Sequence, residues 1–263
     1  MQLAVAAGTD VGMIRSGNED SFFADPKEHP GLFIVADGMG GHAAGEVASA
    51  MTVEIVTREL HALRDLTSER AKRQVYDALK HANAAVFERT TTESDKQGMG
   101  TTASILLLGN DRYLIGHVGD SRIYRLRDGA FEQLTKDHSY VQEQVDAGFL
   151  TPEQARYHPY SNVITRCVGA GSEVEPDSYE GTVRKGDIFL VASDGLTGMV
   201  DDRRLQQILS GRVKPSRMVD TMISEANGRG GLDNITAIIV HVLACDADEA
   251  PGNQSNQDAA LAR

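Results

Sequence analysis

The feature that most constrains the fold of this chain is an apolar run that stops at an Asp-Gly pair. Residues 32–36, with the sequence LFIVA, precede Asp37 and Gly38, and Gly40 and Gly41 follow two residues later. Consecutive large apolar residues predict a strand that is buried on both faces. The glycines permit positive φ angles and close backbone approach. An ordinary Asp-Gly turn has the same pattern, so this segment alone does not indicate a function.

Carboxylates recur beside other apolar segments of the chain. They follow residues 113–119 and 187–193 and precede residues 21–23 and 235–240; these carboxylates are Asp120, Asp194, the pair Glu19 and Asp20, and Asp233. If those strand ends share one side of a packed sheet, the side chains converge, and like charges at that distance need cations between them. A ligand set made only of oxygen atoms predicts magnesium or manganese.

Composition bounds the domain count and the partners. The chain has 263 residues, 41% of them apolar, which predicts one domain with a substantial core. The formal net charge of −12 argues against nucleic acid or an anionic membrane as a partner. The only cysteines, Cys167 and Cys245, stand far apart, so we expect neither a disulfide framework nor a zinc site, and we expect a reducing compartment.

The N-terminus reads as a first strand rather than a signal peptide. Residues 1–7 carry no basic segment, and their apolar stretch ends at Gly8. No apolar run approaches the length needed to cross a bilayer. These observations predict a soluble cytoplasmic protein.

The order of the elements predicts an α+β sandwich of two mostly antiparallel sheets flanked by helices. We expect one domain over residues 1–243 and a disordered polar tail over residues 244–263. Apolar periodicity and turn signals predict helices over 43–60, from 67 or 68 onward, over 201–209 and over 215–226, and strands over 101–108, 113–118, 122–126, 131–134 and 235–242. A short helical excursion interrupts the strands over 139–163, where Thr151 to Gln154 forms a capping box.

The chain resembles the PP2C (PPM) family of metal-dependent protein serine/threonine phosphatases, in the compact bacterial form. The resemblance runs in the family's order to about Val242, and it rests on the segments 15–20 (RSGNED), 36–41 (ADGMGG), 100–103 (GTTA), 118–122 (VGDSR), 192–195 (ASDG) and 233–236 (DNIT). It implies a four-layer α-β-β-α sandwich with a small flap subdomain over about 139–163. It also implies hydrolysis of phosphoserine and phosphothreonine by a metal-activated water, using two Mn²⁺ or Mg²⁺ ions, with a position for a third.

The resemblance assigns metal-binding roles to five positions. Asp37 is expected to bridge both ions, and Gly38 to offer its carbonyl oxygen. Asp194 and Asp233 complete the first coordination shell on the family's pattern. Asp120, together with Asp194, matches the position where bacterial members bind a third ion.

Arg15 is the expected substrate-binding residue. An Arg in this loop would donate two parallel hydrogen bonds from its planar guanidinium group to two oxygens of the substrate phosphate. Glu19 and Asp20 would hold metal-bound waters or a metal itself. A surface Arg that is merely solvated is the alternative for Arg15.

One departure from the family pattern concerns the general acid. Better-known members place His directly after the Asp-Gly pair, but here that position is Met39. His42, three residues on, is the nearest candidate, and a His that only packs or faces solvent is the alternative. The other histidines show no metal-ligand spacing.

Other mechanisms and classes fit less well. A cysteine phosphatase needs Arg six positions after Cys, but Glu173 and Pro251 occupy those positions, and a P-loop is absent. An aspartyl-phosphate motif is approached only by residues 246–250 in the polar tail. A catalytically inactive binding module should have lost its metal carboxylates, and here they are retained. The resemblance implies phosphorylated protein partners, including a Ser/Thr kinase that this monomeric enzyme would oppose.

Overall fold

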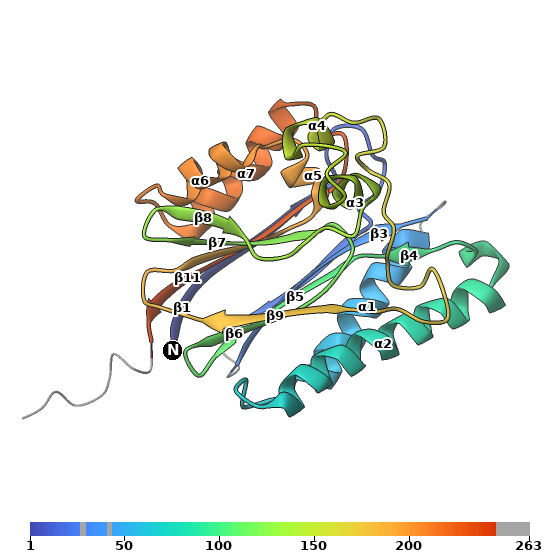
Figure 1. Ribbon diagram of the computed structural model, residues 1–263, viewed down its shortest axis with the longest axis horizontal. Helices are drawn as coiled ribbons and strands as arrows, with labels where there is room; N and C mark the ends of the chain where they lie inside the picture. The colour runs from blue at the N-terminus through green and yellow to red at the C-terminus, as the bar shows by residue number, and fades with distance from the viewer. Residues whose placement is uncertain (27–29, 41–43, 246–263) are drawn as a thin grey trace, which may run out of the picture.

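Two antiparallel sheets packed face to face between helices form the body of the computed structural model, which describes residues 1–26, 30–40 and 44–245. Helices α6 and α7 cover one sheet and helices α1 and α2 cover the other (Figure 1). The predicted α+β, four-layer arrangement is confirmed. Every strand pairing between the named strands is antiparallel.

The five-stranded sheet has the order β1-β11-β10-β7-β8. Its strands are β1 (Gln2–Asp10), β7 (Arg122–Arg127), β8 (Ala130–Gln133), β10 (Ile188–Ala192) and β11 (Ile235–Ala244). The strand β11 extends through Ala244, and Cys245 is buried in the core between the sheets. The folded domain therefore reaches two residues beyond the expected boundary, and residues 246–263 lie outside the described part of the chain.

The other sheet has the order β2-β3-β5-β6-β9, and the short strand β4 pairs with β3. Its strands are β2 (Asp20–Asp25), β3 (Gly31–Met39), β4 (Gly100–Thr101), β5 (Ala103–Gly109), β6 (Arg112–Val118) and β9 (Asp177–Thr182). The predicted strand over 101–108 is thus broken at Thr102, whose backbone N–H donates to the carbonyl oxygen of Asp37 over 2.9 Å.

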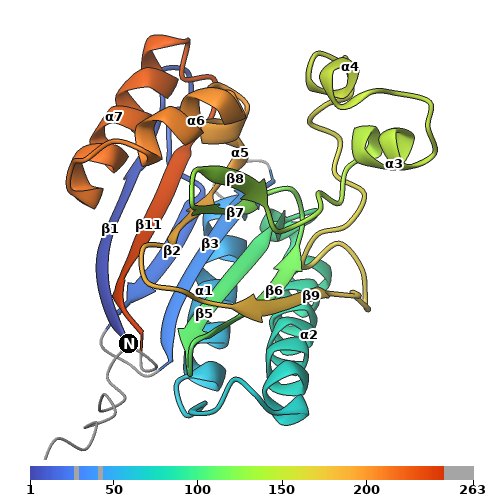
Figure 2. The same ribbon diagram turned by 60° about the vertical axis from the view of Figure 1, so that its left-hand side comes forward.

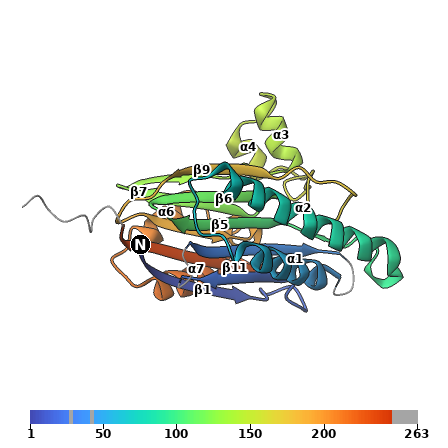
Figure 3. The ribbon, with the colours of Figure 1, turned by 90° about the horizontal axis from the view of Figure 1, so that it is seen from below.

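The helices lie outside the two sheets. Helices α1 (Ala44–Leu60) and α2 (Glu69–Thr92) run across the six-stranded sheet (Figure 3). Helices α5 (Asp194–Thr197), α6 (Asp202–Leu209) and α7 (Pro215–Gly228) lie on the side of the five-stranded sheet. Helices α3 (Tyr140–Asp146) and α4 (Pro152–Arg156) stand apart from both layers (Figure 2). No helix in the described ranges is long and apolar enough to cross a membrane.

The apolar runs form strands because each of their faces meets a core. Phe33 and Val35 of β3 point into the core between the sheets, whereas Leu32 and Ile34 pack under α1 and α2. In β10, Phe189 lies between the sheets and Leu190 packs under the helices α6 and α7. Burial on both faces removes the alternation expected of a half-exposed strand.

Local signals also set the helix ends. Ser68 caps α2 by accepting a hydrogen bond from the Ala71 N–H. The predicted capping box at α4 is present, since Thr151 and Gln154 bond each other's backbone N–H groups. Strand β9 was not expected from the sequence. Its residues, DSYEGT, alternate only between partly buried and exposed positions because it forms an edge of the sheet.

Candidate active site

The predicted carboxylates meet where the two sheets end. Asp20 and Asp37 are direct partners in the pairing of β2 with β3. Asp194 is the first residue of α5, two residues after the end of β10, and its negative charge raises the pKa of Asp37. Asp233 precedes β11 and Asp120 follows β6. We call these five residues the acidic cluster.

The negative charges of the acidic cluster act on one another. Burial raises the pKa of Asp37 well above its usual value, and the negative charges of the other four members raise it further. Burial, followed by repulsion from Asp194 and Asp233, raises the pKa of Asp20 to about 7 even though the Ser193 hydroxyl donates a hydrogen bond to it. Burial and Asp194 also raise the pKa of Asp120. Ionising all of these carboxyl groups together is therefore unfavourable unless positive charge is bound next to them.

Three oxygens of the acidic cluster are buried without a hydrogen-bond partner in the described structure. They are Oδ1 of Asp20, Asp120 and Asp194. Buried polar atoms in proteins nearly always have partners, so each such oxygen calls for an explanation. Hard divalent cations bind oxygen ligands of this kind, and the residues present therefore fit magnesium or manganese.

The acidic cluster is not a closed protein cage for one ion. Among the residues that the structure describes, no three side chains of Asp, Glu, His or Cys are arranged to hold a metal ion by themselves. Magnesium is commonly held by one or two carboxylates while it keeps several waters. The arrangement suits that mode and not a zinc site with four protein ligands.

Arg15 lies against the acidic cluster and pairs with one of its members. Its Nη2 atom donates to Asp233 Oδ2 over 2.6 Å, although the two residues are 218 positions apart. The Arg15 side chain is 48% exposed and that of Asp233 is 33% exposed. Glu19 and Asp37 also contribute to the negative potential at the guanidinium group. The structure thus joins two predicted site residues that the sequence analysis had assigned to different partners.

Asn234 holds the Arg15 loop in place. Its Nδ2 group donates to the carbonyl oxygens of Val11 and Gly17, and its Oδ1 atom accepts from the Glu19 N–H. Asn234 is buried, and it follows Asp233 directly. Asn234 belongs to the segment 233–236 of the family resemblance, but the sequence pattern predicts no role for it. An Asn between a site Asp and a buried strand is the signal that could have revealed it.

Hydroxyl groups fix the backbone of Asp37. The Asp37 N–H donates to Thr102 Oγ1, and Thr101 Oγ1 donates to the Asp37 carbonyl oxygen, both over 2.9 Å. Thr102 Oγ1 also lies 2.8 Å from Ser121 Oγ. These three residues are buried, so the carboxylate of Asp37 projects from a rigid backbone. Their role was likewise not predicted.

The glycines of the two Asp-Gly pairs allow another part of the backbone to pack directly against them. A Cβ atom at Gly38 would collide with the carbonyl oxygen of Gly45, and one at Gly195 with the carbonyl oxygen of Asn234. The positive φ angle expected of the first glycine turn occurs at Gly40, where φ is 146°. Met39 is partly buried and pairs with Gly100. Gly41 and His42, the predicted general acid, lie outside the described residues.

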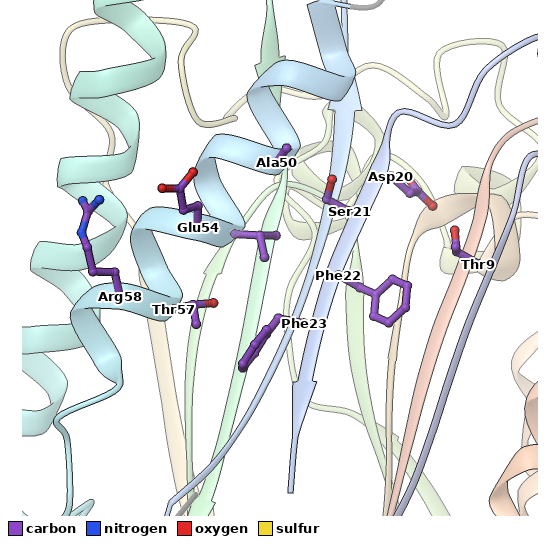
Figure 4. Close-up of a pocket in the computed structure, with 10 residues that line it drawn as sticks. Thr9, Asp20, Ser21, Phe22, Phe23, Ala50, Glu54, Thr57 and Arg58 are labelled. Atoms are coloured by element: carbon purple, nitrogen blue, oxygen red, sulfur yellow. The ribbon is translucent and has the colours of Figure 1, made fainter.

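A groove with a volume of about 600 Å³ lies beside the acidic cluster, between β2 and α1 (Figure 4). Asp20 is the only member of the cluster that lines it. The other lining residues include Phe22, Phe23 and Val53, so most of the groove is apolar. This groove is distinct from the surface where Arg15 meets Asp233.

Comparisons with known proteins agree with this geometry. The sequence profile described as Protein phosphatase 2C matches residues 14–227. A putative protein phosphatase 2C-type of Streptococcus pyogenes is 39% identical over 240 residues, which are 91% of this chain and 97% of the relative. The serine/threonine phosphatase stp of Listeria monocytogenes is 38% identical over 236 residues, or 88% and 93% of the two chains.

Solved structures give the same result. The Mycobacterium tuberculosis serine/threonine phosphatase PstP/Ppp has a TM-score of 0.84 and 37% identity, over 92% of this chain and 99% of that one. The catalytic domain of PstP in complex with two manganese ions has a TM-score of 0.82 and 36% identity, with coverage of 92% and 99%.

The fold and the acidic cluster thus define a metal-dependent phosphatase, and the chain belongs to the protein phosphatase 2C family. It is a serine/threonine protein phosphatase of the kind represented by Stp and PstP. The predicted family, fold class and enzyme class are confirmed.

Proposed function

We propose that the acidic cluster binds two Mn²⁺ or Mg²⁺ ions, and that Arg15 binds the phosphate of phosphoserine and phosphothreonine side chains in protein substrates. The observation that carries this proposal is the set of three buried, unpartnered Asp oxygens among carboxylates that raise one another's pKa. Two manganese ions in the structure of the PstP catalytic domain support the number of ions.

Four residues would hold the two ions on the family's pattern: Asp37, Gly38 through its carbonyl oxygen, Asp194 and Asp233. When bound, the ions supply Lewis-acid catalysis and lower the pKa of water toward neutrality, so that hydroxide is available to attack phosphorus. The rigid backbone of Asp37 fixes the central carboxylate.

Two further carboxylates are adjacent in the chain, Glu19 and Asp20, and Asp20 pairs with Asp37 across β2 and β3. Asp20 orients its carboxylate through the hydrogen bond from Ser193. The pKa of Glu19 is raised chiefly by burial, and the nearby charge of Arg15 opposes this shift. We propose that both residues hold waters of the metal site. Asp120, whose buried Oδ1 is also unpartnered, would bind a third ion together with Asp194.

Arg15 is positioned to receive a phosphate beside the acidic cluster. Its guanidinium group presents several donors in a planar fork, and only Nη2 is used by Asp233. The remaining donors can face two oxygens of a phosphoryl group. Half of the side chain is exposed, so a phosphorylated residue can reach it from solvent.

We propose His42 as the group that protonates the leaving oxygen. General acid catalysis matters most for a basic leaving group such as a serine alkoxide and little for a nitrophenolate. His42→Ala should therefore lose activity mainly on a phosphoserine peptide and keep it on p-nitrophenyl phosphate. Equal losses on both substrates would assign His42 a structural role, and no loss on either would exclude it.

The biological partners follow from the enzyme class. We propose that the substrates are phosphorylated proteins, including a Ser/Thr kinase whose action this phosphatase opposes, and that the enzyme acts as a monomer. The sequence holds only two cysteines, Cys167 and Cys245, far apart in the chain, which supports a reducing compartment such as the cytoplasm.

Titration calorimetry with MnCl₂ tests the proposed metal site. Wild-type protein should show at least two binding events, and Asp37→Asn should lose them because one substitution damages the shells of both ions. Asp120→Ala should lose only a weaker event. Asp128→Asn, at an exposed hairpin turn, serves as the control for charge. Unchanged binding to Asp37→Asn would refute the assignment.

A further inference from the structure

Three large apolar side chains stand exposed beside the pair of Arg15 and Asp233. Met13 is 66% exposed, Ile14 is 68% exposed and Leu232 is 56% exposed. Met13 and Ile14 directly precede Arg15, and Leu232 directly precedes Asp233. We call these three residues the apolar wall. Exposed apolar groups gathered next to a functional site indicate a binding surface.

The apolar wall is held rigidly against the site. The Met13 N–H donates to the Gly231 carbonyl oxygen over 2.8 Å, and a Cβ atom at Gly231 would lie 2.8 Å from Met13 Cγ. Gly12 has a φ of 83° and leaves no room for a Cβ against the backbone of Asp233. The two loops are therefore locked together.

Further hydrogen bonds hold the Arg15 loop on both sides of Arg15. Asn234 holds the loop on either side of Arg15 through the carbonyl oxygens of Val11 and Gly17. Asn227 Nδ2 donates to Asp10 Oδ1 over 3.0 Å at the start of the same loop. The apolar wall thus keeps a fixed position relative to the Arg15 guanidinium group.

The position of the apolar wall next to Arg15 indicates that it contacts the substrate. When a phosphorylated residue binds at Arg15, each neighbouring residue of an extended peptide lies about 3.3–3.6 Å further along the chain. The nearest neighbours can therefore contact the side chains that flank Arg15. The chain's net charge of −12 disfavours acidic flanking residues. An apolar flanking residue meets a matching apolar surface and no such penalty.

We propose that Met13, Ile14 and Leu232 determine substrate specificity by contacting an aliphatic or aromatic residue next to the phosphoserine or phosphothreonine of the substrate. This inference rests on the proposed role of Arg15 in phosphate binding. It assigns the enzyme a preference for apolar over acidic or small polar flanking residues.

The test compares two phosphothreonine peptides of equal length that differ only in the residues flanking phosphothreonine, Leu in one and Ser in the other. Wild-type enzyme with MnCl₂ should show a ratio of kcat/KM of about tenfold in favour of the Leu peptide, the size that a single aliphatic contact provides. Ile14→Ser and Leu232→Ser should each bring this ratio close to one, and Ile14→Leu should retain it.

The matched control is Leu243→Ser. Leu243 is also an exposed leucine, but it lies eight residues beyond Ile235 along β11, about 27 Å from the site at 3.4 Å per residue. This variant should keep the wild-type ratio. Because the serine substitutions are made on exposed side chains, their thermal unfolding should match that of wild type.

The outcomes separate this inference from the proposed function. Metal-dependent turnover of both peptides without a preference, or a preference that survives Ile14→Ser and Leu232→Ser, would overturn the role of the apolar wall and leave the proposed function intact. No turnover of any substrate with metal would instead overturn the proposed function. If light scattering shows dimers that Ile14→Ser dissociates while the ratio is unchanged, the wall is a self-association surface and the inference is wrong.

Discussion

The Ser193 hydroxyl donates a hydrogen bond to Asp20 Oδ2 over 2.8 Å and so joins the two sheets beside the acidic cluster. Asp20 begins β2 in one sheet, and Ser193 follows β10 in the other. The same hydroxyl oxygen accepts from the Thr236 N–H over 2.9 Å. All three residues are buried, so these bonds are not exchanged with water.

Ser193→Ala should destabilise the domain because it leaves a buried carboxylate oxygen and a buried N–H group unsatisfied. We expect the free energy of unfolding to fall by about 1–3 kcal/mol, measured by urea denaturation in the presence of chelator. Ser210→Ala, at the exposed end of α6, is the control and should change stability little. A Ser193→Ala protein as stable as wild type would show that this contact does not hold the sheets together.

Asp20→Asn should stabilise the metal-free protein at pH 8. The folded-state pKa of Asp20 is about 7, above its usual value, so the stability that its protonation provides is lost as the pH rises from about 4 through 7. The amide removes this charge and can still accept from Ser193. We expect a gain of at least about 1 kcal/mol at pH 8 that shrinks at pH 4, measured by denaturation in EDTA. A loss of stability at pH 8 would contradict the repulsion.

His117 should impose the opposite pH dependence. It is fully buried, and burial followed by the nearby His138 lowers its pKa to about 4. Its Nδ1 atom lies 3.0 Å from Ser104 Oγ, and its Nε2 atom lies 3.1 Å from the carbonyl oxygen of Lys136. Because the unfolded chain binds the proton more tightly, this site loses stability as the pH falls from about 6.5 to 4.

His117→Gln removes that titration. Between pH 7 and pH 5, wild type should lose about 2 kcal/mol more stability than His117→Gln does. The two variants are compared by chemical denaturation at each pH, so that contributions from other groups cancel. Parallel losses in the two proteins would show that His117 does not titrate differently in the folded and unfolded states.

Arg15→Lys should impair substrate binding although it keeps the positive charge. Lysine cannot reproduce the planar fork that would contact Asp233 and two phosphate oxygens together. We expect kcat/KM on a phosphothreonine peptide to fall by about 10–100-fold, corresponding to the loss of about 1.5–3 kcal/mol for a charge-assisted hydrogen bond. Arg73→Lys, on an exposed position of α2, is the control. Unchanged kinetics would remove Arg15 from the substrate site.

Much of the fold was predictable because the relevant signals are local. The apolar runs that became β3 and β10 are buried on both faces, and the caps at Ser68 and Thr151 have clear signatures in the sequence. Strand β9 carried no such signal, because an edge strand pairs through its backbone and buries few apolar side chains. Strand β9 was therefore missed, whereas the edge strands β1 and β8 carry apolar and turn signals and were predicted.

The candidate site was predictable in its members but not in its contacts. The carboxylates stand next to apolar runs, so their convergence could be expected. The pairing of Arg15 with Asp233 depends on loops 218 residues apart, and no local pattern encodes it. His117 and His138 seemed scattered in the sequence, yet the fold places their rings 4.9 Å apart. Such contacts arise from tertiary structure alone.

Release of phosphate from a phosphothreonine peptide, measured with MnCl₂ and with excess EDTA, tests the central claim most directly. Wild-type enzyme should be active with Mn²⁺ or Mg²⁺ and lose activity with EDTA, and Zn²⁺ should not substitute well. Asp37→Asn should be inactive under every condition, because it affects both ions. Full activity of wild type in EDTA, or metal-dependent activity of Asp37→Asn at the wild-type rate, would contradict a catalytic metal site built on the acidic cluster.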